Sequence, residues 1–447
     1  MKQILLIAIL SLGFGGFAQE TKNLSLKDAI NFALQNKADA KKAKLDIENA
    51  EYEIQDTRSQ ALPNLSANGN LTYNPILQNS ALPGEFFGQP PGSIVLVPFG
   101  QKWASTAGLS LTQNIFDMAV FTGLRAARST REFYQINSSL TDEQIIENVA
   151  TAYYEVFVAQ EKFAVSDSTY NNTSKTRNVI KGQFDNGLAK KIDLDRTIVK
   201  LNNNDTERQK AANQVILSEN ALKFLIGMPI STAIVLAKSD MDVKTILSEE
   251  AKPNVETRTE FQLMQKEEQL LVFQKKSKVA AYYPTLALAA NYNYQGLGNQ
   301  FPWFETPDNG VYWSDYSSIG LNLKVPIFSG LGNKAKVGKA DVELRKHQVD
   351  MEDTKLRLAK EFEDAATNIK SNLATLESQK QNVTLAESVL SDTRNNYYNG
   401  LAPLTDLLDA ENELTTARNN YNTALLEYKK AEIQLMKSKG ELKTLTQ

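Results

Sequence analysis

Three short sequence landmarks occur twice in this chain, in the same order and about half a chain apart. Each pair shares its spacing and its residue character, and the pairs are 61–65 with 282–286, 113–117 with 325–329, and 186–189 with 399–402. Landmarks that return in the same order indicate a duplicated supersecondary unit. The duplication constrains the fold strongly, because every element assigned to one half should have a counterpart in the other.

Each half contains two segments in which apolar and polar residues alternate, as they do in a strand with one apolar face. These segments cover 65–74 and 107–112 in the first half and 286–295 and 318–327 in the second. Such strands, at roughly ten residues, have about the length that a tilted strand needs to cross a bilayer.

Most of the remaining chain is predicted to be helical. Two proline-free runs, 117–185 and 329–399, are long enough for helices of roughly 100 Å at 1.5 Å per residue. Shorter helices are predicted over 192–226 and 405–438, and another from the Ser25 capping box to about residue 60.

The long runs carry a narrow apolar stripe and end at a glycine. Val342, Val349 and Leu356 belong to a series at helical spacing, which predicts a coiled-coil-like seam that needs neighbouring helices. Gly187 and Gly400 follow the last predicted turns, where a C-terminal cap favours glycine.

The composition excludes several chemistries. The formal net charge of the 447 residues is −3, so there is no basic excess that would indicate a nucleic-acid partner. The chain has no cysteine, which excludes disulfides and thiol chemistry, and its single histidine argues against a zinc site or histidine-based catalysis. That histidine, His347, lies among Lys346, Gln348 and Asp350, and we predict it to be a solvated surface residue. We expect no cofactor and no metal.

Residues 1–18 are predicted to be a cleavable signal peptide. Lys2 precedes an apolar run over 4–12, and Gly16-Phe17-Ala18 forms a small-x-small cleavage site. A transmembrane anchor is the alternative, but the apolar run is too short to span a bilayer.

Four amphipathic strands are too few for a membrane barrel, since the smallest single-chain barrels have about eight. A homotrimer would supply twelve strands, enough to close without leaving edges in lipid. Residues such as Leu71, Leu109, Leu288 and Leu321 would then face lipid, and an Asn-rich face would line the lumen. A soluble sandwich with a buried apolar face remains the alternative from periodicity alone.

Nearly the whole mature chain resembles the TolC-like outer membrane efflux proteins. The resemblance rests on the duplicated pattern of helix, Leu-Pro-x-Leu and strand, and on residues 397–410, which match that family's Gly-x-x-x-x-x-Asp-x-x-Asp-Ala turn. A returning helix that carries Leu414, Ala417, Arg418 and Tyr421 follows this turn. The first half has a looser copy of the turn over 187–193.

The resemblance implies a mainly α-helical protein with a membrane β-barrel. A trimer would form a twelve-stranded barrel in the Gram-negative outer membrane and a long coiled-coil tube in the periplasm, with four strands and an internal two-fold repeat in each chain. The expected domains are repeats over 19–227 and 254–447, joined by a connector over 228–253. The expected function is export of small molecules or secreted proteins, together with a periplasmic adaptor and an inner-membrane RND, ABC or MFS pump.

The resemblance also assigns roles to residues near the two glycine turns. Asp406, Asp409 and Asp193 are expected at a pore constriction that selects cations, although the macrodipole alone favours carboxylates at a helix N-terminus. Tyr397 is expected in a gate. The docking tips for the adaptor would include Gly187, Leu188, Gly400 and Leu401.

Two positions depart from the family pattern. Ala402 and Leu425 stand where many relatives carry basic residues that hold the gate shut. Lys190, Lys191 or Arg196 are the candidate substitutes.

Two other classes of protein compete with this interpretation. A periplasmic adaptor or coiled-coil scaffold also contains helical hairpins, but one hairpin rather than two copies with strands in each half. A secreted hydrolase is disfavoured by the single histidine, the absence of cysteine and the absence of a Gly-x-Ser-x-Gly elbow. We therefore expect a protein that is not an enzyme.

Overall fold

The computed structural model describes residues 22–237, 254–304 and 310–446. The predicted signal peptide and most of the predicted connector lie outside these residues. The first half contains β1 (Lys22–Leu24), α2 (Leu26–Asn36), α3 (Ala38–Ser59), β2 (Asn64–Tyr73), β3 (Asn79–Pro83), β4 (Ile94–Pro98), β5 (Trp103–Phe116), α4 (Met118–Asp185) and α5 (Lys191–Ile226). The rest contains β6 (Ile234–Leu236), α6 (Thr259–Ala280), β7 (Thr285–Gly298), β8 (Val311–Lys324), α7 (Gly332–Tyr398) and α8 (Leu404–Lys439). Short 3-10 turns cover Gly84–Phe87, Val255–Thr257 and Leu442–Thr446.

The order and the lengths of the main elements correspond between the two halves. Helices α3 and α6 each have 22 residues, and α5 and α8 each have 36. The long helices α4 and α7 have 68 and 67 residues. The sequence prediction of two long helices, each followed by a helix of about half its length, is confirmed.

The chain divides into two compact units. The helical unit is formed by the described parts of 1–47, 134–265 and 349–447, and the sheet unit by 48–133 and 266–348. Among the described residues, no helix combines the length and the hydropathy needed to cross a bilayer.

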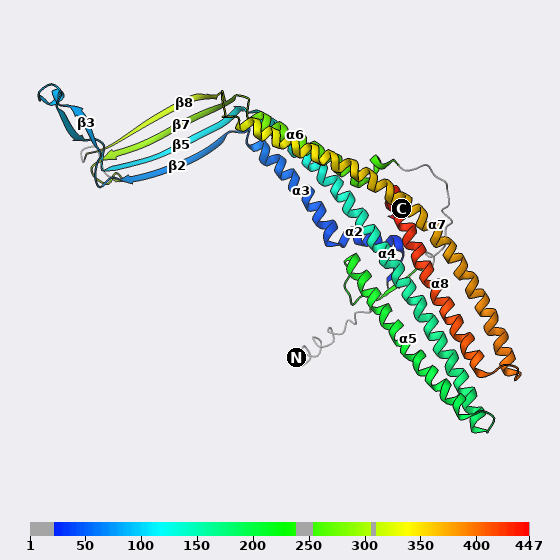
Figure 1. The fold of residues 1–447 in the computed structure, drawn as a ribbon. Coiled ribbons are helices and arrows are strands. Elements are labelled where there is room, and N and C mark those ends of the chain that lie inside the picture. Colours follow the sequence, from blue (N-terminus) through cyan, green and yellow to red (C-terminus); the bar gives the residue numbers. More distant parts are fainter. Residues whose placement is uncertain (1–21, 238–253, 305–309, 447) are drawn as a thin grey trace, which may run out of the picture. The chain divides into compact units, whose positions relative to one another are not determined.

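The sheet unit is built around one antiparallel four-stranded sheet, in the order β2-β5-β7-β8 (Figure 1). Directly opposed residues share a face, so the register tests the predicted alternation. One row across the sheet is apolar and the next row is polar; the first consists of Leu65, Leu111, Ala290 and Ile319, and the second of Ser66, Ser110, Asn291 and Ser318. The prediction of four strands with one apolar and one polar face is confirmed.

Side-chain hydrogen bonds link the strands on the polar face. The hydroxyl oxygens of Ser66 and Ser110 lie 2.7 Å apart, and Asn291 Nδ2 donates to Ser318 Oγ at 3.0 Å. Asn68 Nδ2 also donates to Ser110 Oγ at 3.3 Å. The apolar face, in contrast, leaves Leu65, Leu321 and other large side chains exposed in a single copy.

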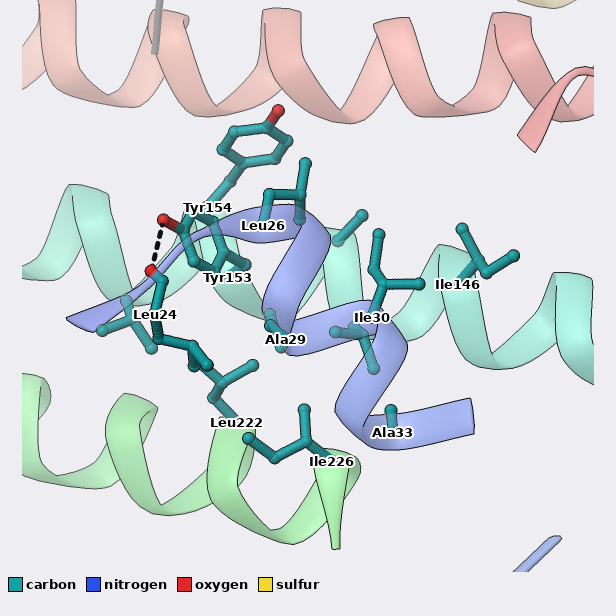
Figure 2. Close-up of a cluster of buried hydrophobic side chains, with 14 of the residues drawn as sticks. Leu24, Leu26, Ala29, Ile30, Ala33, Ile146, Tyr153, Tyr154, Leu222 and Ile226 are labelled. Atoms are coloured by element: carbon teal, nitrogen blue, oxygen red, sulfur yellow. Dashed lines mark hydrogen bonds between the residues drawn. The ribbon is translucent and has the colours of Figure 1, made fainter. Parts of the chain in front are cut away.

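The largest core of the helical unit joins its N-terminal segment to the middle of α4 (Figure 2). Ser25 caps α2 by accepting a hydrogen bond from the Asp28 N–H at 3.1 Å, as the capping box predicts. The helix then buries Ile30 and its apolar neighbours against α4 and the C-terminal end of α5. Strand β1 pairs in parallel with β6, and the Tyr153 hydroxyl donates to the Leu24 carbonyl at 3.0 Å.

Two sequence predictions about helices are wrong. The helix that starts after Ser25 does not continue to residue 60, because Lys37 adopts an extended conformation (ψ 136°) that separates α2 from α3. His347 is not solvated: only 8% of it is exposed. It follows Ala340 by seven residues and precedes Met351 by four, and both of these are buried, so His347 occupies the buried stripe of α7.

The predicted seam of α7 is confirmed only in part: its members Leu358, Ile369 and Leu376 are buried. Val342, Val349 and Leu356 are exposed, whereas the buried stripe in the helical unit passes through Met351 and Leu358 and continues toward Leu376. An α-helix with two separate apolar stripes can contact neighbours on two sides. Helix α7 therefore uses one stripe within the chain and presents a second stripe outward.

Candidate functional site

The residues assigned to the site lie at two helical tips, both in the helical unit. The first tip (residues 186–197) joins α4 to α5, and the second tip (residues 399–410) joins α7 to α8. Gly187 and Gly400 have φ angles of 72° and 74°, in the left-handed region where glycine carries no Cβ penalty.

Both tips turn through the same hydrogen bonds. The N–H of Leu188 donates to the Gln183 carbonyl at 2.7 Å, and that of Leu401 donates to the Asn396 carbonyl at 2.8 Å. The glycine N–H groups donate to carbonyls three residues earlier, which completes a Schellman cap at each tip. The prediction that Gly187 and Gly400 cap the long helices is confirmed.

The leucines that follow the glycines point away from the chain. Leu188 is 81% exposed and Leu401 is 77% exposed. Each tip therefore presents one exposed leucine at the end of a helical hairpin.

The two returning helices begin differently. In the second tip, Leu404 and Leu407 are buried in a cluster with Ile180 of α4 and Leu390 of α7. In the first tip, Ile192 is exposed, and Thr197 is the first residue of α5 that is buried. The start of α8 is therefore buried more deeply than the start of α5, where Leu194, the counterpart of Leu407, is only partly buried against the same cluster.

The three predicted constriction carboxylates lie in the first turns of these helices. Asp406 and Asp409 are exposed and are three residues apart, so they share one face of α8. Asp193 of α5 is half-buried. Counting from Gly187 and Gly400, Asp193 corresponds to Asp406, but the counterpart of Asp409 is Arg196.

Tyr397 and Asp193 are brought together, although they belong to different helices. Burial raises the pKa of Tyr397, and the charge of the nearby Asp193 carboxylate raises it further. The predicted basic partner position, Leu425, is buried with Ile369, and Ala402 offers no charge. Within the described part of the chain, no ion pair joins Asp193 to Lys190, Lys191 or Arg196, so the proposed substitutes do not pair with it here.

One buried residue near the second tip, Glu411, was not predicted from the sequence. It is only 6% exposed, and both carboxylate oxygens are buried. Arg394 of α7 places Nη2 at 3.7 Å from Glu411 Oε1. Burial raises the pKa of Glu411, while the positive charges of Arg394 and Lys200 act in the opposite direction.

A small cavity of about 20 Å³ lies beside Glu411, with Thr169 of α4 and Thr415 of α8 in its lining. This volume is sufficient for one water molecule. The spacing of Leu404, Leu407, Glu411 and Leu414 by three and four residues could have revealed the burial of Glu411, because it places the carboxylate on the apolar stripe of α8. No group of three or more His, Cys, Asp or Glu side chains in the described ranges could hold a metal ion.

Comparison with known proteins identifies the family. The family model for "Outer membrane efflux protein" matches residues 29–228 and 258–441. The chain is 24% identical over 346 residues to the outer membrane protein TolC of Vibrio cholerae serotype O1, covering 75% of this chain and 77% of that protein. It is 21% identical over 455 residues to TolC of Escherichia coli K12, covering 99% and 87%.

The fold also matches solved structures. The crystal structure of the outer membrane protein VceC from Vibrio cholerae aligns with a TM-score of 0.70 at 18% sequence identity, over 93% of this chain and 96% of that chain. Members of the matched family are channels of the outer membrane rather than enzymes. This chain is accordingly an outer-membrane protein, and it belongs to the outer membrane efflux protein family.

Proposed function

We propose that three copies of this chain form one channel through the outer membrane. The observation that supports this most strongly is the four-stranded sheet, in which the outer edges of β2 and β8 pair with no other strand in the described chain. An open sheet cannot remain in lipid with unpaired edges, whereas twelve strands from three copies can close into a barrel. The apolar face would contact lipid, and the face rich in Ser and Asn would line a wet lumen.

The helices would continue this channel into the periplasm as a coiled-coil tube. The outward stripe of α7, which includes Val349 and Leu356, supports this arrangement because it needs a neighbouring helix to cover it. The exposed Ile216 and Leu217 of α5 support it in the same way. The two repeats would cover residues 19–227 and 254–447, joined by a connector over 228–253. Three copies would therefore contribute six similar repeats to the wall of the channel.

The trimer would export small molecules or secreted proteins to the outside. It would work with a periplasmic adaptor and an inner-membrane pump of the RND, ABC or MFS class, and the channel itself would catalyse no reaction. The exposed Leu188 and Leu401 at the glycine-capped tips support adaptor docking there. Replacement of both leucines with Asp should abolish export without loss of the trimer, and wild-type export by this variant would contradict docking at the tips.

The narrowest part of the channel would lie at the second tip. Asp406 and Asp409 are exposed on one face of α8, and three copies would place six carboxylates around the axis. Asp193 would add a second carboxylate position, and Tyr397 beside it would take part in the gate. A ring of carboxylates attracts cations and repels anions.

Planar bilayers provide the direct test of this function. The purified protein should require detergent, insert into the bilayer and produce cation-selective single-channel currents. A protein that remains in aqueous solution without detergent and produces no current would overturn the proposed function.

A further inference from the structure

The sheet meets the helices at two junctions, one in each repeat. At the first junction α3 leads into β2 and β5 leads into α4, and at the second junction α6 leads into β7 and β8 leads into α7 (Figure 1). The duplicated landmarks align residues 54–60 with 275–281 and residues 112–124 with 324–336. All four segments belong to the sheet unit, so each junction provides a reference for the other.

The second junction is strongly basic. Residues 275–281 and 324–336 contain no acidic residue and six lysines: Lys275, Lys276, Lys278, Lys324, Lys334 and Lys336. The matching segments of the first junction contain Asp56, Arg58 and Asp117, and every position that matches a lysine is uncharged. The fold of a junction therefore does not require these lysines, and their excess needs another explanation.

Two of these lysines, Lys278 and Lys334, lie on the α6–α7 helix pair near the sheet. An ion pair of 2.7 Å joins Lys275 of α6 to Asp341 of α7. Lys278 is three residues further along α6, and Lys334 is seven residues before Asp341, so both positions lie between this ion pair and the sheet. Both side chains are exposed, and within the described ranges neither forms an ion pair. Their positive charges are therefore available to a partner outside the chain.

An apolar pocket opens beside Lys334. It has a volume of about 230 Å³, and its apolar lining consists of Tyr282, Ile327, Phe328 and Leu331. Ile327 is 95% exposed and Phe328 is 82% exposed. The φ angle of Leu331 is 64°, in the left-handed region that is rare for a bulky residue, and its side chain is also exposed. The second junction thus combines uncovered apolar side chains with unpaired positive charge.

The first junction has a pocket of similar volume, about 220 Å³, but of different character. Gln113, Asn114 and Asp117 form part of its lining. The Asp117 carboxylate caps α4 by accepting a hydrogen bond from the Ala119 N–H at 2.8 Å, and Ala119 occupies the position that matches Leu331. The first pocket therefore offers amides and a negative charge, where the second offers apolar surface and a positive charge.

The second pocket lies at the end of the apolar face of the sheet. Leu321 and Leu323 are on that face, and Ile327 continues their alternation in the sequence just beyond β8. The proposed channel turns this face toward lipid and extends its helices into the periplasm. The second junction would then lie at the level of the lipid headgroups in the periplasmic leaflet.

We propose that the second junction binds an anionic phospholipid of the periplasmic leaflet. The lipid phosphate would lie at Lys278 and Lys334, and the start of an acyl chain would cover Phe328 and its apolar neighbours. This inference rests on the proposed function and adds a ligand to it. A basic pocket at the end of membrane-spanning elements suits a molecule that joins a negative headgroup to apolar chains.

A neighbouring copy fits this surface less well than a lipid. In a closed ring, the β8 edge of one copy lies beside the β2 edge of the next. The residues that precede β2, 54–60, contain one aspartate and one arginine and so carry no net charge. They would not neutralise the lysines of the second junction, whereas an anionic headgroup would.

Lipid titration tests this site. The full chain, purified in detergent, would be titrated with phosphatidylglycerol, and retained lipid would be counted by native mass spectrometry. We expect one retained lipid per copy. Lys278→Gln/Lys334→Gln should weaken binding roughly 25-fold, since each lysine at an anionic lipid surface contributes about fivefold. Zwitterionic phosphatidylcholine and soluble glycerol phosphate should bind weakly, because one lacks the net charge and the other lacks the acyl chains.

A matched control removes the same charge near the first junction. Arg125 and Arg128 are exposed on α4, and Arg125→Gln/Arg128→Gln should leave phosphatidylglycerol binding unchanged. An equal loss in this control, or equal binding of phosphatidylcholine, would overturn the site. Loss of the trimer in the lysine variant, without any effect of lipid, would assign the surface to a neighbouring copy and also overturn it.

The lipid site and the channel can fail separately. A wild-type protein that conducts in planar bilayers but retains no phosphatidylglycerol would overturn the lipid site alone. A protein that produces no current and is monomeric would overturn the proposed function, and the lipid site with it.

A fluorescent variant gives a second measurement. The three native tryptophans lie toward the opposite end of the sheet, so Phe328→Trp adds a probe in the pocket itself. Brominated phosphatidylglycerol should quench this probe more strongly than brominated phosphatidylcholine, and Lys278→Gln/Lys334→Gln should abolish the difference. Equal quenching by the two lipids would indicate general membrane contact and overturn the proposal.

Discussion

The first and second tips turn with the same backbone hydrogen bonds, yet their returning helices present different surfaces. In the second tip, Leu404 and Leu407 are buried and two carboxylates are exposed on one face. In the first tip, Ile192 is exposed and the counterpart of Asp409 is the oppositely charged Arg196. A shared turn therefore fixes where the chain reverses, while the residues after the turn decide how deeply each returning helix is buried and which charges it exposes.

The largest expected effect concerns this difference in burial. Leu407→Ala should destabilise the second tip by about 2–5 kcal/mol, because Leu407 is almost fully buried among large apolar side chains. Ile192→Ala in the first tip should change stability by no more than about 0.5 kcal/mol, because this side chain is exposed. Hydrogen exchange of the amides in α8 and α5 measures both effects, and equal losses at the two tips would remove the distinction.

The second effect concerns charge. Asp406→Ala/Asp409→Ala should weaken block of the channel by trivalent cations roughly tenfold, equivalent to about 1.4 kcal/mol, and should reduce cation selectivity. Asp193→Ala should have a smaller effect, because the position three residues after Asp193 carries Arg196 in place of the carboxylate that Asp409 supplies in the second tip. Bilayer recordings of block and reversal potential provide the comparison. Unchanged block in the double variant would remove the proposed role of Asp406 and Asp409.

The third effect should be the same at both tips. Gly187→Ala and Gly400→Ala should each cost about 1 kcal/mol, because an L-residue is disfavoured at these positive φ angles even though the space for a Cβ is open. Replacement by Asn should cost less, since Asn tolerates this conformation. Thermal unfolding followed by circular dichroism would reveal the losses. A large difference between the two alanine variants would contradict the shared cap.

The smallest effect concerns Glu411. Burial raises the pKa of Glu411, so the folded protein holds this proton more tightly than the unfolded chain does. The protonated carboxyl therefore favours the folded state at low pH, and this contribution to stability is lost as the pH rises through the raised pKa. Glu411→Gln should therefore stabilise the protein by about 0.5–1 kcal/mol at neutral pH. The gain should disappear in acid, where the wild-type carboxyl is neutral.

Denaturant titrations at several pH values measure this dependence, with the exposed Glu413→Gln as the matched control. A gain that is independent of pH, or an equal gain from the control, would show that the buried charge of Glu411 is not its source.

The contrast between the tips also shows what the sequence could predict. The glycine caps, the long helices and the two-faced strands were predictable because each depends on local spacing: Asn-Gly after a proline-free run, and alternation over about ten residues. The exposure of Ile192 and the burial of Leu407 could not be predicted, because they depend on which neighbouring helix each side chain meets. The burial of His347 and Glu411 was missed because their type suggested solvent, although their spacing placed both on apolar stripes.

The outer end of the sheet presents a similar case. The segment between β2 and β5 is rich in Pro and Gly, and the sequence analysis assigned no strand to it, but residues 79–83 and 94–98 pair as strands. Short strands that alternate over only five residues give little signal, and their pairing is specified by the ladder that continues from β2 and β5. The parallel pair of β1 and β6 was missed for the same reason, because each strand has three residues.

The number of copies in the purified particle tests the central claim most directly. Native mass spectrometry of the full-length protein, released from detergent micelles, should give three times the mass of the mature chain. That result would place twelve strands in one particle, as closure of the four-stranded sheets requires. A particle with the mass of one chain, stable without detergent, would contradict the account.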